Sequence, residues 1–214
     1  MQAQTEKIAG EWESWARRWL AIGQGENAML WTAGKPATPP QRYLRAYFDI
    51  LTQSIARTWP EGPRKLDCLE LGAGRGTTSQ YLAHAGHDVT LIDLAETGFD
   101  IARRNWRATG LEPPRCIIAD CQATGLAAET FDLVHSVGLV EHFPDPSRVF
   151  AESWRLLKKG GLMFHVAIHG GQNGIYRSTF SGADYEAAAN RVGAVVTARR
   201  LMFRGVTLIE GVKP

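Results

Sequence analysis

The sequence predicts an α/β fold of the doubly wound type: a mostly parallel seven-stranded sheet with an antiparallel hairpin at one edge. Three observations favour this class. Short apolar runs alternate with helical stretches after residue 64, two further apolar runs lie close together near the C-terminus, and 44% of the 214 residues are hydrophobic. A chain of this size and composition can bury one full core.

Buried strands are predicted where apolar residues continue without interruption over only a few positions, because a strand covered on both faces shows no alternation. Five such runs are rich in Val, Ile, Leu and Phe: residues 65–71, 88–93, 115–120, 131–137 and 161–168. Strands separated by helical stretches are typical of a parallel sheet with helical crossover connections.

Helices are predicted between these strands, where apolar residues recur at helical spacing. The three stretches are residues 77–86, 95–110 and 146–161. The last one ends in Lys-Lys-Gly-Gly at 158–161, which is typical of a helix stop. After a further helix near 182–193, the two apolar runs that meet around Arg204 and Gly205 are close enough for a hairpin.

The first 60 residues are predicted to form a helical lid beside a core at 61–214, within one compact domain. Apolar residues recur at three- and four-residue steps on one helical face: Ile8, Trp12, Trp15, Trp19 and Ile22. A second helix is expected from Pro40 to about Thr58. A lid would exclude water from a reaction site, and the alternative is that the tryptophan-bearing face packs on the flank of the sheet.

Composition argues against several classes of partner. The formal net charge is +2 and no run of Lys or Arg forms the basic stripe of a nucleic-acid-binding protein. No signal-peptide pattern and no apolar run of membrane-spanning length is present, so a cytoplasmic protein is expected, as a monomer or homodimer. The three cysteines, Cys68, Cys116 and Cys121, are expected to be buried thiols in a reducing compartment.

A glycine-rich stretch, Leu-Glu-Leu-Gly-Ala-Gly-Arg-Gly at 69–76, follows the first predicted strand. In open α/β sheets, ligands bind beyond the carboxyl ends of the strands. A dinucleotide fingerprint would place its third glycine at position 77, which is Thr77, and the Gly-Lys-Ser/Thr of a Walker phosphate loop is absent. Glu70 would repel a pyrophosphate but could accept hydrogen bonds from an ammonium or a hydroxyl group. The loop therefore suits a cationic ligand better than a dinucleotide.

This stretch resembles the first motif, Glu-x-Gly-x-Gly-x-Gly, of the class I S-adenosylmethionine-dependent methyltransferases. The resemblance implies S-adenosylmethionine as cofactor and S-adenosylhomocysteine as product. It implies that Asp93 binds the ribose hydroxyls, that Leu94 packs on the adenine, and that Asp120 faces the adenine amino group. The implied cofactor-binding residues are Glu70, Gly72, Ala73, Gly74, Gly76, Asp93, Leu94, Asp120, Cys121, Gln122 and Val137. Carboxylates suit both places, because ribose hydroxyls and an amino group are donors.

The segment after the fourth predicted strand, with Glu141 and His142 before Phe-Pro-Asp-Pro, further resembles the type-11 methyltransferases, which include the ubiquinone-pathway O-methyltransferases. We expect His142 to be the general base and Glu141 its orienting partner. The alternative is that the pair caps the strand end. Those relatives tend to carry a further acidic residue, associated with a metal, where this chain has Gly138. One carboxylate and one histidine make a poor magnesium site, so no metal is expected.

The acceptor is expected to be a small molecule that is methylated on oxygen or nitrogen by in-line displacement. Histidines His165 and His169 are secondary candidates for the base, whereas His135 and His165 within strands are more typical of core histidines. The expected substrate-binding residues are Trp31, Tyr43, His169, Tyr176 and Arg177, with Phe180 nearby. Two alternatives stay open: a non-catalytic protein that binds S-adenosylmethionine or S-adenosylhomocysteine, and a dinucleotide-dependent oxidoreductase.

Overall fold

The computed structural model describes residues 39–62, 64–169, 179–201 and 205–214. The elements in these ranges are α2 (Pro39–Thr58), β1 (Asp67–Leu71), α3 (Thr77–His84), β2 (Asp88–Asp93), α4 (Glu96–Ala108), β3 (Arg115–Ile118), β4 (Phe131–Val137), the 3-10 helix η1 (Val140–His142), α5 (Ser147–Leu156), β5 (Leu157–Ile168), α6 (Gly182–Asn190), β6 (Thr197–Arg200) and β7 (Val206–Val212). Within these ranges, no helix is both long and apolar enough to cross a membrane.

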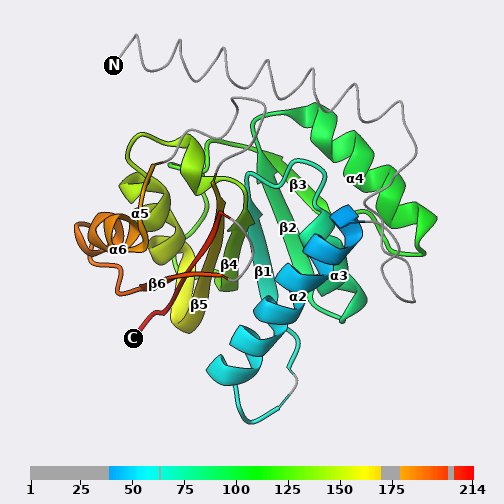
Figure 1. The fold of residues 1–214 in the computed structure, drawn as a ribbon. Helices are drawn as coiled ribbons and strands as arrows, with labels where there is room; N and C mark the ends of the chain where they lie inside the picture. Colours follow the sequence, from blue (N-terminus) through cyan, green and yellow to red (C-terminus); the bar gives the residue numbers. More distant parts are fainter. Residues whose placement is uncertain (1–38, 63, 170–178, 202–204) are drawn as a thin grey trace.

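The strands form a seven-stranded sheet in the order β3-β2-β1-β4-β5-β7-β6 (Figure 1). The pairs among β1 to β5 are parallel, and β7 runs antiparallel to both β5 and β6. This confirms the predicted sheet and its edge hairpin. The chain builds outward from β1 to β3 and then returns to β4, so the switch point for a ligand lies at the carboxyl ends of β1 and β4.

Helices cover both faces of the sheet, with α2, α3 and α4 on one face and α5 and α6 on the other (Figure 1). Leu51 of α2 and Leu82 of α3 pack in a core with Phe164 of β5. On the opposite face, Phe150 of α5 and Tyr185 of α6 share a core with neighbouring strand positions. Because helices cover both faces of the sheet, residues on both sides of each strand are buried, which explains the continuous apolar runs in the sequence.

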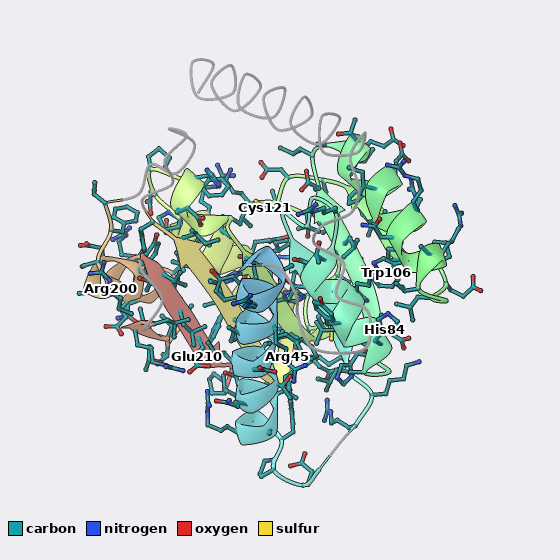
Figure 2. All side chains as sticks on the ribbon, turned by 45° about the vertical axis from the view of Figure 1, so that its right-hand side comes forward. Arg45, His84, Trp106, Cys121, Arg200 and Glu210 are labelled. Atoms are coloured by element: carbon teal, nitrogen blue, oxygen red, sulfur yellow. The ribbon has the colours of Figure 1, made fainter. Side chains whose placement is uncertain are left out.

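Helix α2, which lies within the segment expected to form a lid, packs against the sheet. Leu51 is buried in the core, and the Ser54 hydroxyl donates to Glu210 Oε2 of β7 at 2.6 Å. Arg57 forms an ion pair with the same carboxylate at 3.1 Å, and Figure 2 shows Glu210 beside the lower end of this helix. Both apolar and polar contacts therefore hold α2 against the sheet. The rest of the expected lid, residues 1–38, lies outside the described residues.

The helix stop expected at Lys-Lys-Gly-Gly is wrong, because α5 ends at Leu156 and the lysines lie in β5. Leu157 is fully buried and pairs with Phe131 of β4, which extends the backbone at this point. Lys158 Nζ then donates to carboxylates at the amino ends of the neighbouring strands, Asp67 at 2.7 Å and Asp132 at 3.0 Å. Strand pairing thus overrides the local helix-ending pattern.

Candidate active site

The glycine loop joins β1 to α3 at the switch point of the sheet. Gly72, Gly74 and Gly76 have positive φ angles of 60°, 52° and 59°, a region that favours glycine. A Cβ atom at Gly72 would lie 2.5 Å from Leu139 Cδ1. The N–H of Ala73 donates to the carbonyl of Ile92 at 2.9 Å, which ties the loop to the end of β2. The left-handed backbone conformation therefore favours glycine at all three positions.

Glu70 of β1 lies directly behind the loop, with only 4% of its surface exposed. Its Oε2 accepts the N–H of Ser79 at 3.3 Å, and the N-cap residue of α3, Gly76, has no side chain that could do so. Burial raises the pKa of Glu70 to about 7, and hydrogen bonds from Ser79 oppose this shift. The helix N-terminus that holds pyrophosphate in dinucleotide-binding folds is here capped by a carboxyl group.

Asp93 lies on the other side of the loop, at the end of β2. Its Oδ2 accepts the N–H of Gly74 at 2.7 Å and its Oδ1 accepts the N–H of Ala95 at 2.8 Å. Burial raises the pKa of Asp93, and these backbone hydrogen bonds work against the rise. The next residue, Leu94, is 39% exposed. A fixed carboxylate and an exposed apolar side chain thus stand together at this strand end.

The end of β3 lies beside that of β2, because the N–H of Ala119 donates to the carbonyl of Asp93 at 3.2 Å. Asp120 Oδ1 accepts the N–H of Gln122 at 2.8 Å and so shapes the following turn. Cys121 is buried, and Figure 2 shows it at the upper edge of the sheet. Burial raises the pKa of the Cys121 thiol well above its usual value, so this thiol is unreactive.

Glu141 and His142 belong to η1, which follows Val137 at the end of β4. Glu141 is 1% exposed, and its Oε1 accepts the N–H of Ile168 at 3.1 Å. Burial raises the pKa of Glu141 to about 8, which makes it a neutral acid near pH 7. His142 is half-buried, and its backbone N–H donates to the carbonyl of Leu139 at 3.1 Å. The hydrogen bond from Ile168 to Glu141 ties η1 to the end of β5.

Residues 69–165 match the family model described as a methyltransferase domain. The match begins in β1 and ends in β5, so it spans the parallel part of the sheet. A ubiquinone biosynthesis O-methyltransferase of Stutzerimonas stutzeri is 35% identical over 118 residues, which are 55% of this chain and 50% of that protein. One of Bordetella avium is 36% identical over 47% of this chain and 42% of its own length. The chain thus spans about half the length of these curated relatives.

Solved methyltransferase structures share the fold. The 1,6-didemethyltoxoflavin-N1-methyltransferase of Burkholderia thailandensis, solved with S-adenosylhomocysteine, has a TM-score of 0.70 at 18% identity, over 99% of this chain and 89% of its own. The magnesium protoporphyrin IX methyltransferase of Synechocystis, solved with bound S-adenosylmethionine, has a TM-score of 0.62 at 18% identity, over 91% of both chains. The similarity extends the common architecture over most of the chain.

The two histidines within strands β4 and β5 are both buried. His165 is fully buried between the Ser136 and Ser153 hydroxyls, at 2.7 and 3.1 Å, so it is the core histidine that its strand position predicts. His135 is also fully buried, with Ser79 Oγ at 3.3 Å from its Nε2. Burial lowers the pKa of each imidazole to about 3. Neither histidine can therefore serve as a proton acceptor for a substrate near neutral pH.

His169 lies just beyond β5 and is partly accessible. Its Nε2 is 3.1 Å from Thr207 Oγ1, and its ring centroid is 5.9 Å from that of Tyr185. Phe180 packs edge-on against the same tyrosine at 5.4 Å. Of the other expected substrate residues, Trp31, Tyr176 and Arg177 lie outside the described residues, as does the side chain of Tyr43. In the described ranges no group of at least three His, Cys, Asp or Glu could hold a metal, and the absence of a metal stays a prediction.

Sequence reasoning missed Gly98 in the first turn of α4. A Cβ atom there would lie 2.3 Å from the carbonyl oxygen of Gly74, so the helix start rests directly on the glycine loop. An isolated glycine inside a predicted helix lowers helix stability, so a packing reason for it can be sought. The Ser79–His135 contact was also missed, because no sequence pattern connects a helix start to a strand 56 residues later.

Proposed function

We propose that this protein is an S-adenosylmethionine-dependent methyltransferase that methylates an oxygen or nitrogen atom of a small molecule. The observation that carries the proposal is the pair of carboxyl groups around the glycine loop, with Glu70 capping α3 and Asp93 fixed on Gly74. An acidic loop repels a pyrophosphate and attracts a cationic ligand that also offers hydroxyl donors. A sulfonium amino acid joined to a ribose has both features.

Each part of the donor has a candidate partner among the described residues. Asp93 would accept hydrogen bonds from the ribose hydroxyls, and Leu94 would pack on the adenine. Asp120 would accept from the adenine amino group, beside the backbone of Cys121 and Gln122. Bound S-adenosylmethionine supplies an activated methyl group, so the chain has to align an acceptor and, for a hydroxyl, remove a proton.

His142 is the proposed general base. It follows Glu141 on η1, next to the loop, and an imidazole titrates near neutral pH. Glu141 keeps its proposed part in the site as a positioning residue, because its neutral carboxyl group fixes the η1 backbone relative to β5. His142 would take the proton of the acceptor hydroxyl while the acceptor oxygen bonds to the methyl carbon and the carbon–sulfur bond breaks.

The proposed acceptor is a small phenol or nitrogen heterocycle. The curated relatives are named for ubiquinone biosynthesis and O-methylation, and one structural neighbour for N1-methylation of 1,6-didemethyltoxoflavin. His169 follows β5, and both His169 and Phe180 pack on the buried ring of Tyr185, which supports a partly aromatic acceptor. Trp31, Tyr43, Tyr176 and Arg177 remain proposed contacts.

Calorimetric titration of the purified protein with S-adenosylmethionine, S-adenosylhomocysteine and reduced nicotinamide dinucleotide, side by side, tests the donor. Micromolar binding of the first two alone is expected. Binding of the dinucleotide alone would refute the proposal and favour an oxidoreductase. Turnover is then measured by release of S-adenosylhomocysteine with panels of phenols and heterocycles. Binding with no turnover on any acceptor would favour a non-catalytic binding protein.

A further inference from the structure

Three polar side chains form a row beneath the glycine loop, on the sheet face that α2 and α3 cover. Glu70 of β1 and His135 of β4 are register partners in the sheet. Ser79 of α3 contacts both, because its N–H donates to Glu70 Oε2 at 3.3 Å and its Oγ lies 3.3 Å from His135 Nε2. All three residues are buried. Donor binding as proposed above uses Glu70 but needs neither Ser79 nor His135.

The proton position on His135 follows from its surroundings. The ring is neutral at pH 7, because burial lowers its pKa to about 3. Among the described residues, the buried Nδ1 has no hydrogen-bond partner. A proton on Nδ1 would leave a buried N–H without an acceptor, whereas a proton on Nε2 leaves only an unused lone pair, which is the smaller penalty. His135 therefore donates from Nε2 to Ser79 Oγ.

This donation settles the direction of the next hydrogen bond. A serine hydroxyl that accepts from one neighbour is free to donate its own proton to another. The Ser79 hydroxyl and backbone N–H both lower the pKa of Glu70, against the larger effect of burial. The chain thus runs from His135 Nε2–H to Ser79 and from Ser79 to the carboxylate, and it favours the ionised form of Glu70.

We propose that Ser79 and His135 are positioning residues that hold the Glu70 carboxylate ionised and oriented toward the ammonium group of the bound donor. The inference rests on the proposed function. It adds that donor affinity is coupled to pH through Glu70, because an ammonium group binds a carboxylate more tightly than a neutral carboxyl group.

Other charged groups surround Glu70. Asp93, from the end of β2, repels its negative charge, and His135 faces it from β4. The glycine loop carries Arg75, whose side chain is buried. On α2, Arg45 and Asp49 pair with each other at 2.6 Å near the surface. Because all of these remain in a Ser79 variant, a change in pH dependence reports the hydroxyl itself.

The test measures the dissociation constant of S-adenosylhomocysteine between about pH 5.5 and 8.5 for the native protein and for Ser79→Ala. Loss of the hydroxyl is expected to move the midpoint of the affinity profile upward by about one pH unit. Ser153→Ala is the matched control, because Ser153 is equally buried and contacts the other core histidine, His165, at 3.1 Å. Its profile is expected to match that of the native protein.

Methylthioadenosine distinguishes the contribution of the ammonium group to binding from that of the nucleoside, because it lacks the amino acid. Its affinity is expected to show no difference in pH dependence between the native protein and Ser79→Ala. Superimposable S-adenosylhomocysteine profiles for the two proteins would overturn the inference while leaving the proposed function intact. Failure of the native protein to bind S-adenosylhomocysteine at any pH would refute the proposed function itself.

A second measurement needs no variant and covers the case in which Ser79→Ala does not fold. Nitrogen NMR of the imidazole rings in the native protein distinguishes the two neutral tautomers. We expect His135 to carry its proton on Nε2 across the neutral range. A proton on Nδ1 would reverse the direction of the hydrogen-bond chain and overturn the inference.

Discussion

At the scale of single residues, carboxyl groups at strand ends carry most of the candidate donor site. Asp93 is the strongest case, because two backbone N–H groups fix both of its oxygens beside the loop. The sequence could predict this residue, since an acidic side chain that directly follows a buried strand stands at the ligand edge of an α/β sheet. The sequence could not predict that Glu70 would cap the start of α3, or that burial would raise its pKa to about 7.

Replacing Asp93 by Asn is expected to weaken S-adenosylhomocysteine binding by about 10- to 100-fold, because the amide cannot accept from both backbone N–H groups and both ribose hydroxyls. Calorimetry measures the effect. Asp100→Asn is the control, since this carboxylate pairs with Arg103 on the exposed side of α4. An affinity for Asp93→Asn equal to that of the control would show that the ribose assignment is wrong.

His142→Ala is expected to reduce turnover by about two to four orders of magnitude and to leave donor affinity nearly unchanged, because a general base acts on the acceptor. The measurement needs an acceptor found by the screen and a separate titration of the donor. His84→Ala, at the exposed end of α3, is the matched control. Unchanged turnover in His142→Ala would show that His142 is not the general base, and that alignment of the acceptor alone accounts for the rate enhancement.

At the scale of elements, the contact between the start of α4 and the glycine loop shows how packing of one element on another positions the candidate site. Periodicity predicted that α4 exists, but close packing of a helix against a loop depends on one glycine, Gly98. The end of α5 makes the same point. The Lys-Lys-Gly-Gly pattern predicted a helix stop, and pairing of Leu157 with Phe131 ended the helix earlier.

Gly98→Ala is expected to lower the free energy of unfolding by about 1–3 kcal/mol, because a methyl group would overlap the Gly74 carbonyl and force the helix away from the loop. It should also weaken S-adenosylhomocysteine binding. Gly182→Ala is the control, because a Cβ atom there would lie 2.8 Å from the carbonyl oxygen of Ala198, far from the loop in the fold. Equal loss of affinity in both variants would mean that α4 does not position the loop.

At the scale of the whole molecule, buried titratable groups set how stability depends on pH. The unfolded chain protonates His135 and His165 near pH 6.5, while burial lowers both native pKa values to about 3. Stability is therefore lost as pH falls through this range. The opposite holds for Glu70 and Glu141, whose native pKa values are raised to about 7 and about 8. The unfolded chain releases their protons above about pH 4.5, so stability falls as pH rises.

The two effects together predict a stability maximum between about pH 4.5 and 6.5, with each group contributing a slope of at most about 1.4 kcal/mol per pH unit. Urea unfolding at a series of pH values measures it. Glu141→Gln is expected to flatten the decline above about pH 6.5, whereas Glu112→Gln, at an exposed position, should not. A decline that survives in Glu141→Gln without any change would contradict the neutral, buried state of this side chain.

The amino-acid sequence was enough to predict the order of strands and helices, the edge hairpin, the glycine loop and the acidic residues at the strand ends. These features depend on residues that are close together in the chain, so periodicity and local motifs indicate them. Three contacts are visible only in the folded protein: α2 covers the sheet, Gly98 packs on Gly74, and Glu141 accepts a hydrogen bond from Ile168. Burial and hydrogen bonds between segments far apart in the chain set the protonation of Glu70 and the proton position on His135, because both depend on three-dimensional surroundings.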